Sequence, residues 1–164
     1  MGQPPEIRQL LSILDQAYDH RSWHGTNLRG SIRGVSPAQA AWRPAVGRHN
    51  IWEIVVHASY WKYVAWRRMT RAPRGAFPLK GSNWFRRSLL DASASEKAWR
   101  ADLALLDEMH GSLRAAAAAL TPRNLYRKGT GGADSRFSLV AGAAAHDLYH
   151  AGQIQLLKRL GPGQ

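Results

Sequence analysis

The chain contains 164 residues, of which 45% are hydrophobic and 21% are charged, so we expect one domain over residues 1–164 with a buried core and exclude a disordered chain. It contains no cysteine, which excludes disulfides, iron–sulfur clusters and thiolate metal sites and leaves histidine and carboxylate as the metal ligands. A surplus of 23 Lys and Arg over 11 Asp and Glu gives a formal net charge of +12, which favours anionic partners.

The first helix is expected over residues 5–32, because side chains of one face recur there at spacings of three and four residues. Gly25 and Gly30 weaken its last turns. In the connection over residues 34–50, the segment Ser36-Pro37-Ala38-Gln39 has a capping residue followed by proline, a pattern that predicts one short helical turn. The face of the first helix consists of Ile7, Leu10, Leu14, Ala17, His24 and Leu28.

The second helix is expected over residues 50–71. Asn50 can accept a hydrogen bond from the free backbone N–H groups of the first turn, and Glu53 lies at the position of a capping box. The spacing of Ile54, His57, Trp61 and Val64 places them on one inward face. The following residues, 71–88, contain two prolines and two glycines, which predicts a long crossover that shapes a pocket.

Two further helices are expected over residues 93–120 and 135–160, joined by a polar loop at 129–134. The inward face of the last helix carries two imidazoles and an amide where leucine would normally pack, so these polar groups need a partner. Four amphipathic helices without strand alternation predict an all-α four-helix bundle. The face of the last helix consists of Leu139, Ala143, His146, His150, Gln153, Leu157 and Leu160.

Three inward histidines form a candidate metal site. His146 and His150 are four residues apart and therefore lie one turn apart on the same face of a helix. His57 can supply a third nitrogen from a facing helix. Three protein ligands leave a coordination position for water or substrate, which is typical of catalytic zinc sites.

Two other interpretations of these histidines remain open. A single inward histidine is more often a hydrogen-bonded core residue than a metal ligand. The run from His146 to His150 also matches the H-E-x-x-H metalloprotease pattern with Asp147 in place of glutamate. Because aspartate is one methylene shorter, we expect Asp147 to be a surface residue or to support a ligand rather than to act as a general base.

The sequence resembles members of the DinB-like (DinB/YfiT) superfamily of metal-binding four-helix bundles, and the resemblance covers nearly the whole chain. Its motifs lie in the first helix, in the connection that follows, at the start of the second helix and in the last helix. They are Trp23-His24-Gly25, Ala41-Trp42-Arg43-Pro44, Gly47-Arg48-His49-Asn50-Ile51-Trp52-Glu53 leading to His57, and His146-Asp147-Leu148-Tyr149-His150-Ala151-Gly152-Gln153-Ile154.

The resemblance implies an up-down-down-up bundle with a long crossover between its second and third helices. It implies that His57, His146 and His150 bind nickel or zinc at one end of the bundle. Characterised members include thiol-dependent transferases and isomerases, so the resemblance implies a metal-dependent enzyme, a thiol (S-)transferase or a hydrolase, acting with a low-molecular-weight thiol or on a small anionic substrate. It also implies a homodimer.

Further pocket residues are expected on the same faces: His24 on the first helix, Trp61 one turn beyond His57, and Gln153 nearly one turn beyond His150. For Trp61, core packing is the competing interpretation. The basic crossover, including Arg86 and Arg87, is expected to select carboxylates.

The alternative function is a non-catalytic basic bundle that binds an anionic partner such as nucleic acid. No helix-turn-helix, zinc-finger or RNA-binding signature accompanies the charge, which counts against this alternative. Residues 1–10 lack the order of a signal peptide, and no apolar run of roughly 18 residues occurs, so a cytoplasmic protein is expected.

Overall fold

The computed structural model describes residues 2–161, so residues 1 and 162–164 of the predicted domain lie outside the described part. The described residues form helices and a single isolated β-bridge, which confirms the all-α prediction. No described helix is both long and apolar enough to cross a membrane. The helices are α1 (Pro5–Tyr18), α2 (Leu28–Ile32), α3 (Pro37–Ala41), α4 (Ile51–Thr70), α5 (Ala92–Ala118), α6 (Pro122–Leu125) and α7 (Arg136–Leu160).

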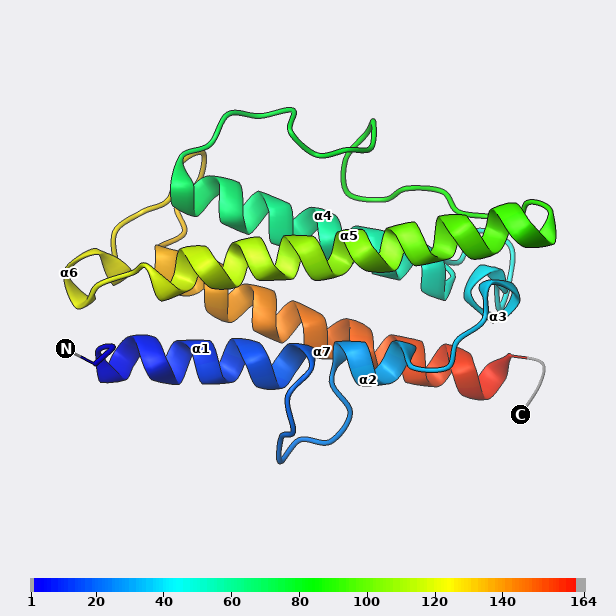
Figure 1. The fold of residues 1–164 in the computed structure, drawn as a ribbon, viewed down its shortest axis with the longest axis horizontal. Helices are drawn as coiled ribbons and strands as arrows, with labels where there is room; N and C mark the ends of the chain where they lie inside the picture. The colour runs from blue at the N-terminus through cyan, green and yellow to red at the C-terminus, as the bar shows by residue number, and fades with distance from the viewer. Residues whose placement is uncertain (1, 162–164) are drawn as a thin grey trace.

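Four long helices, α1, α4, α5 and α7, lie side by side (Figure 1). Helices α1 and α7 run in one direction and α4 and α5 in the other, and the short α2 continues along α7 beyond the end of α1. Helix α4 packs against both α5 and α7, and α1 packs against α7 and α5. The face shared by α4 and α7 therefore lies inside the molecule.

The predicted first helix, residues 5–32, is wrong as a single element. Helix α1 ends at Tyr18, and residues 19–27 form a loop before α2 begins. Asn27 starts α2, because its side chain accepts from Gly30 N and donates to the His20 carbonyl. Gly25 lies in the loop at φ +95°, a conformation that a continuing right-handed helix does not contain.

The other helix starts follow their sequence signals. The short turn predicted after Ser36 is α3, where Ser36 and Gln39 form the reciprocal bonds of a capping box. Helix α4 begins after Asn50, whose side chain accepts from Glu53 N at 2.8 Å. One short helix, α6, was not predicted; it begins at Pro122, directly after the N-cap residue Thr121.

The crossover between α4 and α5 is free of helix and strand, as its prolines and glycines predict. It leaves α4 at Arg71, which adopts the left-handed conformation, and returns along α4 to the start of α5 (Figure 1). Phe77 and Phe85 anchor it, since their rings lie 5.3 and 5.6 Å from the ring of Tyr60. The crossover is thereby held close to the face of α4 that carries His57.

A buried polar layer connects all four long helices. Lys62 of α4 donates to Asp147 of α7 at 2.5 Å, and its Nζ lies 3.4 Å from His110 Nδ1 on α5. The His110 ring stacks on Tyr18 of α1 with centroids 3.6 Å apart. Since Lys62 and Asp147 are fully buried, neither charge can lose its partner without a large cost when α4 packs against α7.

Candidate metal centre

The structure brings the three predicted ligands together between α4 and α7. His146 Nε2 lies 3.1 Å from His57 Nε2 and 3.0 Å from His150 Nε2. One nitrogen from each residue lies within 4.8 Å of the others, so this group could hold a metal ion. His57 and His150 are buried, and His146 is partly exposed, which leaves the cluster accessible from one side.

The second nitrogen of two of these rings is fixed by an acceptor. His57 Nδ1 donates to the backbone carbonyl of Asn83 at 2.7 Å, and His150 Nδ1 donates to Gln153 Oε1 at 2.7 Å. A neutral imidazole that carries its proton on Nδ1 has a lone pair on Nε2. These two bonds therefore direct lone pairs toward the centre of the cluster.

Asn83 reaches His57 because the crossover turns sharply at this position. Its backbone has φ +64°, a left-handed conformation that asparagine tolerates better than most residues. Its side-chain Oδ1 also accepts from Trp61 Nε1 at 2.9 Å. One residue thus links the crossover both to a candidate ligand and to the tryptophan one turn away on α4.

In addition to this hydrogen bond, aromatic stacking holds the His57 ring in place. Trp84 stacks on His57 with ring centroids 3.9 Å apart, and His49 stacks on Trp84 at 3.5 Å. His49 is in turn bonded to Glu53, which Arg43 holds through two bonds. Residues of the two central sequence motifs therefore support the His57 ring through Trp84.

Burial keeps the three imidazoles neutral. Desolvation lowers the pKa of His57 below its usual value. Desolvation, together with the neighbouring histidines, lowers the pKa of His146 to about 3. Desolvation also lowers the pKa of His150, to about 4. Neutral imidazole is the form that binds a metal.

The geometry and chemistry of these residues fit a divalent ion. Nitrogens bound to one zinc ion at about 2.0–2.1 Å with tetrahedral angles lie about 3.3 Å apart, close to the two distances observed here. Without a cation, the His146 Nε2 atom can offer at most one proton to two facing lone pairs. The donor set is all nitrogen, which suits zinc and nickel.

The structure also places the other predicted site residues. Trp61 is 37% exposed, and its ring lies edge-on to His57 and His146 with centroids 6.3 and 6.5 Å away. Gln153 contacts His150 directly, as described above. His24 is exposed in the loop between α1 and α2 rather than on a helix face, so the helical spacing that suggested a pocket position does not apply to it.

Three residues near the centre, Asn83, Trp84 and Lys62, were missed by sequence reasoning. Asn83 and Trp84 carry no local signal, because their role depends on how the crossover folds. Of the two alternatives expected for Asp147, the surface position is wrong, because Asp147 is completely buried; burial raises its pKa while Lys62 opposes that rise. Lys62 had a usable signal, since it interrupts the buried face Val55, Ala58, Lys62, Ala65 and Met69.

The two arginines expected to select carboxylates lie elsewhere. Arg87 is bound to Asp102 through Nε at 2.6 Å and Nη2 at 3.2 Å. Arg86 and Arg87 line a separate cavity beside Trp52. A basic residue that acts at the histidine cluster is therefore neither Arg86 nor Arg87.

A known protein family matches most of this sequence. The sequence profile of the DinB superfamily matches residues 20–154, a range that includes His57, His146 and His150. No curated protein and no solved structure shows a significant match. Because the profile covers most of the sequence and all three clustered histidines, the chain belongs to the DinB superfamily.

Proposed function

We propose that this chain is an up-down-down-up four-helix bundle enzyme that holds one divalent ion, zinc or nickel, with His57, His146 and His150 and acts on a small anionic substrate or thiol. The observation that supports it best is the convergence of three neutral imidazoles. The Nδ1 protons of His57 and His150 are used by Asn83 and Gln153, so their Nε2 lone pairs face His146 without enough protons to pair them.

The remainder of the centre suits a reaction on an exogenous ligand. A divalent ion held by three neutral histidines would leave a position for a thiol or water and lower its pKa. Asn83 and Gln153 hold two of the rings in place. Trp61 lies at the open side next to the partly exposed His146, where it can restrict the approach of a ligand. We therefore propose thiol (S-)transfer or hydrolysis as the reaction class.

The first experiment is elemental analysis of the untagged protein. We expect about one zinc or nickel per chain in the wild type and none in His57→Ala or His146→Ala. His24→Ala is the matched control, because this histidine is exposed and lies in the loop between α1 and α2; it is expected to retain the metal.

A second measurement tests the open position. In cobalt-substituted protein, small thiols and carboxylates are expected to change the visible spectrum, since they can occupy the free coordination position. No metal even after reconstitution, together with DNA binding that falls steeply with salt, would replace this proposal with the basic binding module.

A further inference from the structure

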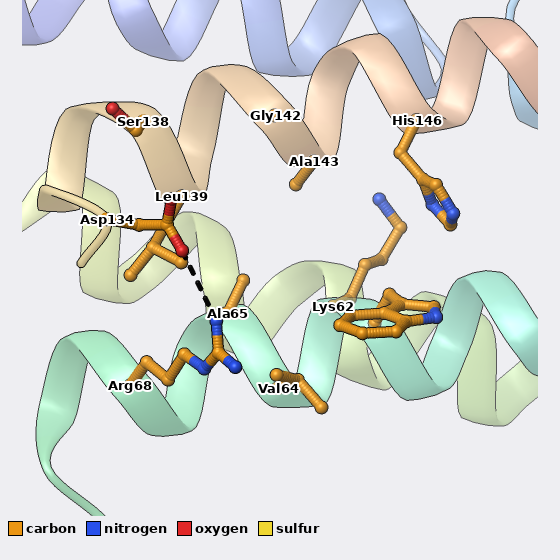
Figure 2. Close-up of a pocket in the computed structure, with 11 residues that line it drawn as sticks. Lys62, Val64, Ala65, Arg68, Asp134, Ser138, Leu139, Gly142, Ala143 and His146 are labelled. Atoms are coloured by element: carbon orange, nitrogen blue, oxygen red, sulfur yellow. Dashed lines mark hydrogen bonds and ion pairs between the residues drawn. The ribbon is translucent and has the colours of Figure 1, made fainter. Parts of the chain in front are cut away.

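A groove between α4 and α7 begins at the candidate metal centre. It has a volume of about 250 Å³, and His146 lines one end of it while Arg68, Asp134 and Ser138 line the other (Figure 2). Trp61 lines the same end as His146, since their ring centroids lie 6.5 Å apart. Apart from Lys62, the residues between the two ends are small or apolar. They are Val64 and Ala65 on α4 and Leu139, Gly142 and Ala143 on α7.

The groove has the length of an extended small molecule. Arg68 follows Trp61 by seven positions on α4, and His146 follows Leu139 by seven positions on α7. At 1.5 Å per residue, each helix therefore advances about 10 Å along the groove. A ligand that reaches both ends needs a linear apolar middle of about this length.

Arg68 lies farther from its carboxylate partner than the ion-paired Arg87 and Arg114 lie from theirs. Its guanidinium contacts Asp134 through Nη1 at 3.4 Å, and within residues 2–161 its buried Nε has no hydrogen-bond partner. By contrast, Arg114 holds Asp15 through Nε and Nη2 at 2.7 and 2.8 Å. Figure 2 shows the Arg68 guanidinium between the two helices, with Asp134 at the end of the groove. Arg68 thus has bonding capacity left for an anion.

A second cavity meets the groove at the same arginine. This cavity has a volume of about 490 Å³ under the crossover and shares Trp61, Val64 and Arg68 with the groove. Among the described residues that line it are four cations and no carboxylate. The cations are Arg67, Arg68, Arg74 and Lys80.

Lys62, the other cation of the groove, does not compete for this role. Its Nζ is bonded to Asp147 at 2.5 Å, and both side chains are fully buried. An anion in the groove therefore finds its best partner at the Arg68 end, about 10 Å of helix beyond Trp61.

We propose that this groove binds an elongated small molecule that places an anionic end, a carboxylate or a phosphate, on Arg68 and its reacting end at the three histidines. The proposal rests on the proposed metal-dependent function and adds the shape and charge of the substrate. Arg68 is the residue that distinguishes charged from uncharged ligands, and Gly142 keeps the groove open.

The experiment uses cobalt-substituted protein and linear hydroxamates of increasing chain length, because a hydroxamate binds metals at one end and leaves the other free to vary. The free end is a carboxylate, a phosphate or an uncharged methyl ester. For chains long enough to reach Arg68, we expect the anionic probes to bind at least about tenfold more tightly than the ester. In Arg68→Gln this ratio is expected to fall to about one.

Two further variants test the groove itself. A Cβ added at Gly142 meets no atom within 4 Å, so Gly142→Leu fits the fold and extends into open space at the groove. We expect this variant to bind long probes more weakly but to bind acetohydroxamate as the wild type does. Gly111→Leu is its matched control, since Gly111 of α5 is equally unobstructed and does not line the groove. Arg159→Gln, at an exposed position, controls for the loss of one positive charge.

The outcomes separate this inference from the proposed function. If acetohydroxamate binds the wild type but a long anionic chain gains nothing over its ester, the groove proposal is wrong and the metal centre stands. If the protein holds no metal, octanoate added to the metal-free protein provides the readout. Shifts of the Gly142 and Ala143 amide resonances that disappear in Arg68→Gln would then support the groove, and their absence in the wild type would overturn it.

Discussion

The arrangement of the histidine cluster depends on two residues that do not belong to it. Asn83 and Gln153 each accept the Nδ1 proton of one imidazole. Such acceptors fix both the tautomer and the orientation of a metal-binding histidine and raise its basicity. Asn83 acts through its backbone carbonyl, which a substitution does not remove, whereas Gln153 acts through its side chain.

Gln153 is therefore the residue at which this contribution can be measured. We expect Gln153→Leu to weaken zinc affinity by about 10–100-fold, because His150 loses the acceptor that holds its proton on Nδ1. Competition with a chromophoric chelator measures the affinity.

The controls for this substitution use the same helix. Gln153→Glu keeps an acceptor at the same position and is expected to preserve zinc affinity. Gln155→Leu makes the same change two residues away, where no contact with the cluster exists, and should leave the affinity unchanged. Equal affinities for all three variants and the wild type would show that His150 does not depend on Gln153.

At the scale of elements, the crossover reaches the metal centre because Glu53 ties its end to the start of α4. The carboxyl group of Glu53 accepts from Arg43, from His49 at 3.0 Å and from the backbone N–H of Arg87 at 3.1 Å. Burial acts to raise its pKa, but these bonds outweigh burial and lower the pKa to about 2. The ionised form is therefore favoured by folding.

This pKa predicts how stability depends on pH. A carboxyl group with a lower pKa in the folded state stabilises the protein above its unfolded value of 4.5 and loses that contribution as the pH falls toward 2. We expect Glu53→Gln to reduce the free energy of unfolding by about 2–3 kcal/mol at pH 7, and this difference to shrink from about pH 5 downward. Urea unfolding at several pH values measures it.

Glu96→Gln provides the comparison for this test. Glu96 pairs with Arg100 at 2.7 Å, but both side chains are largely exposed, so the loss is expected to stay below about 1 kcal/mol. A difference between wild type and Glu53→Gln that is the same at pH 7 and pH 3 would show that the Glu53 charge does not contribute.

Local sequence signals predicted most elements and the cluster itself. Asn50 marked the start of α4, and the four-residue spacing of His146 and His150 placed both rings on one face. The break at residues 19–27 was missed because Leu28 continues the spacing of α1 across the loop by coincidence, and it is indeed buried. Trp84 could not be assigned, since stacking on His57 depends on the path of the crossover.

At the scale of the whole molecule, the buried pair Lys62 and Asp147 lies between the groove and the packed centre of the bundle. Lys62 contacts residues of the three other long helices, including His110 on α5 and the ring of Tyr18 on α1. Desolvation and the nearby Lys62 charge lower the pKa of His110 to about 3, so His110 is neutral and accepts from the ammonium group. Lys62 is thus a buried cation with partners on each of the three other long helices.

This arrangement predicts that replacing one member of the pair lowers the free energy of unfolding much more than replacing both. Lys62→Met leaves the Asp147 carboxylate buried without its cation, which is expected to reduce the free energy of unfolding by about 3–5 kcal/mol. In Lys62→Met/Asp147→Leu no charge remains buried, and we expect most of that loss to be recovered. Urea unfolding at pH 7 measures both variants.

The exposed Lys97 supplies the control, because Lys97→Met removes the same charge from the surface of α5 and is expected to change stability by less than about 0.5 kcal/mol. A double variant less stable than Lys62→Met would mean that the pair itself stabilises the bundle. Recovery would instead mean that the pair selects one packing of α4 against α7. Helix α4 carries His57, and α7 carries His146 and His150. A pair that selects one packing of these two helices therefore also sets the distance between His57 and the other two histidines.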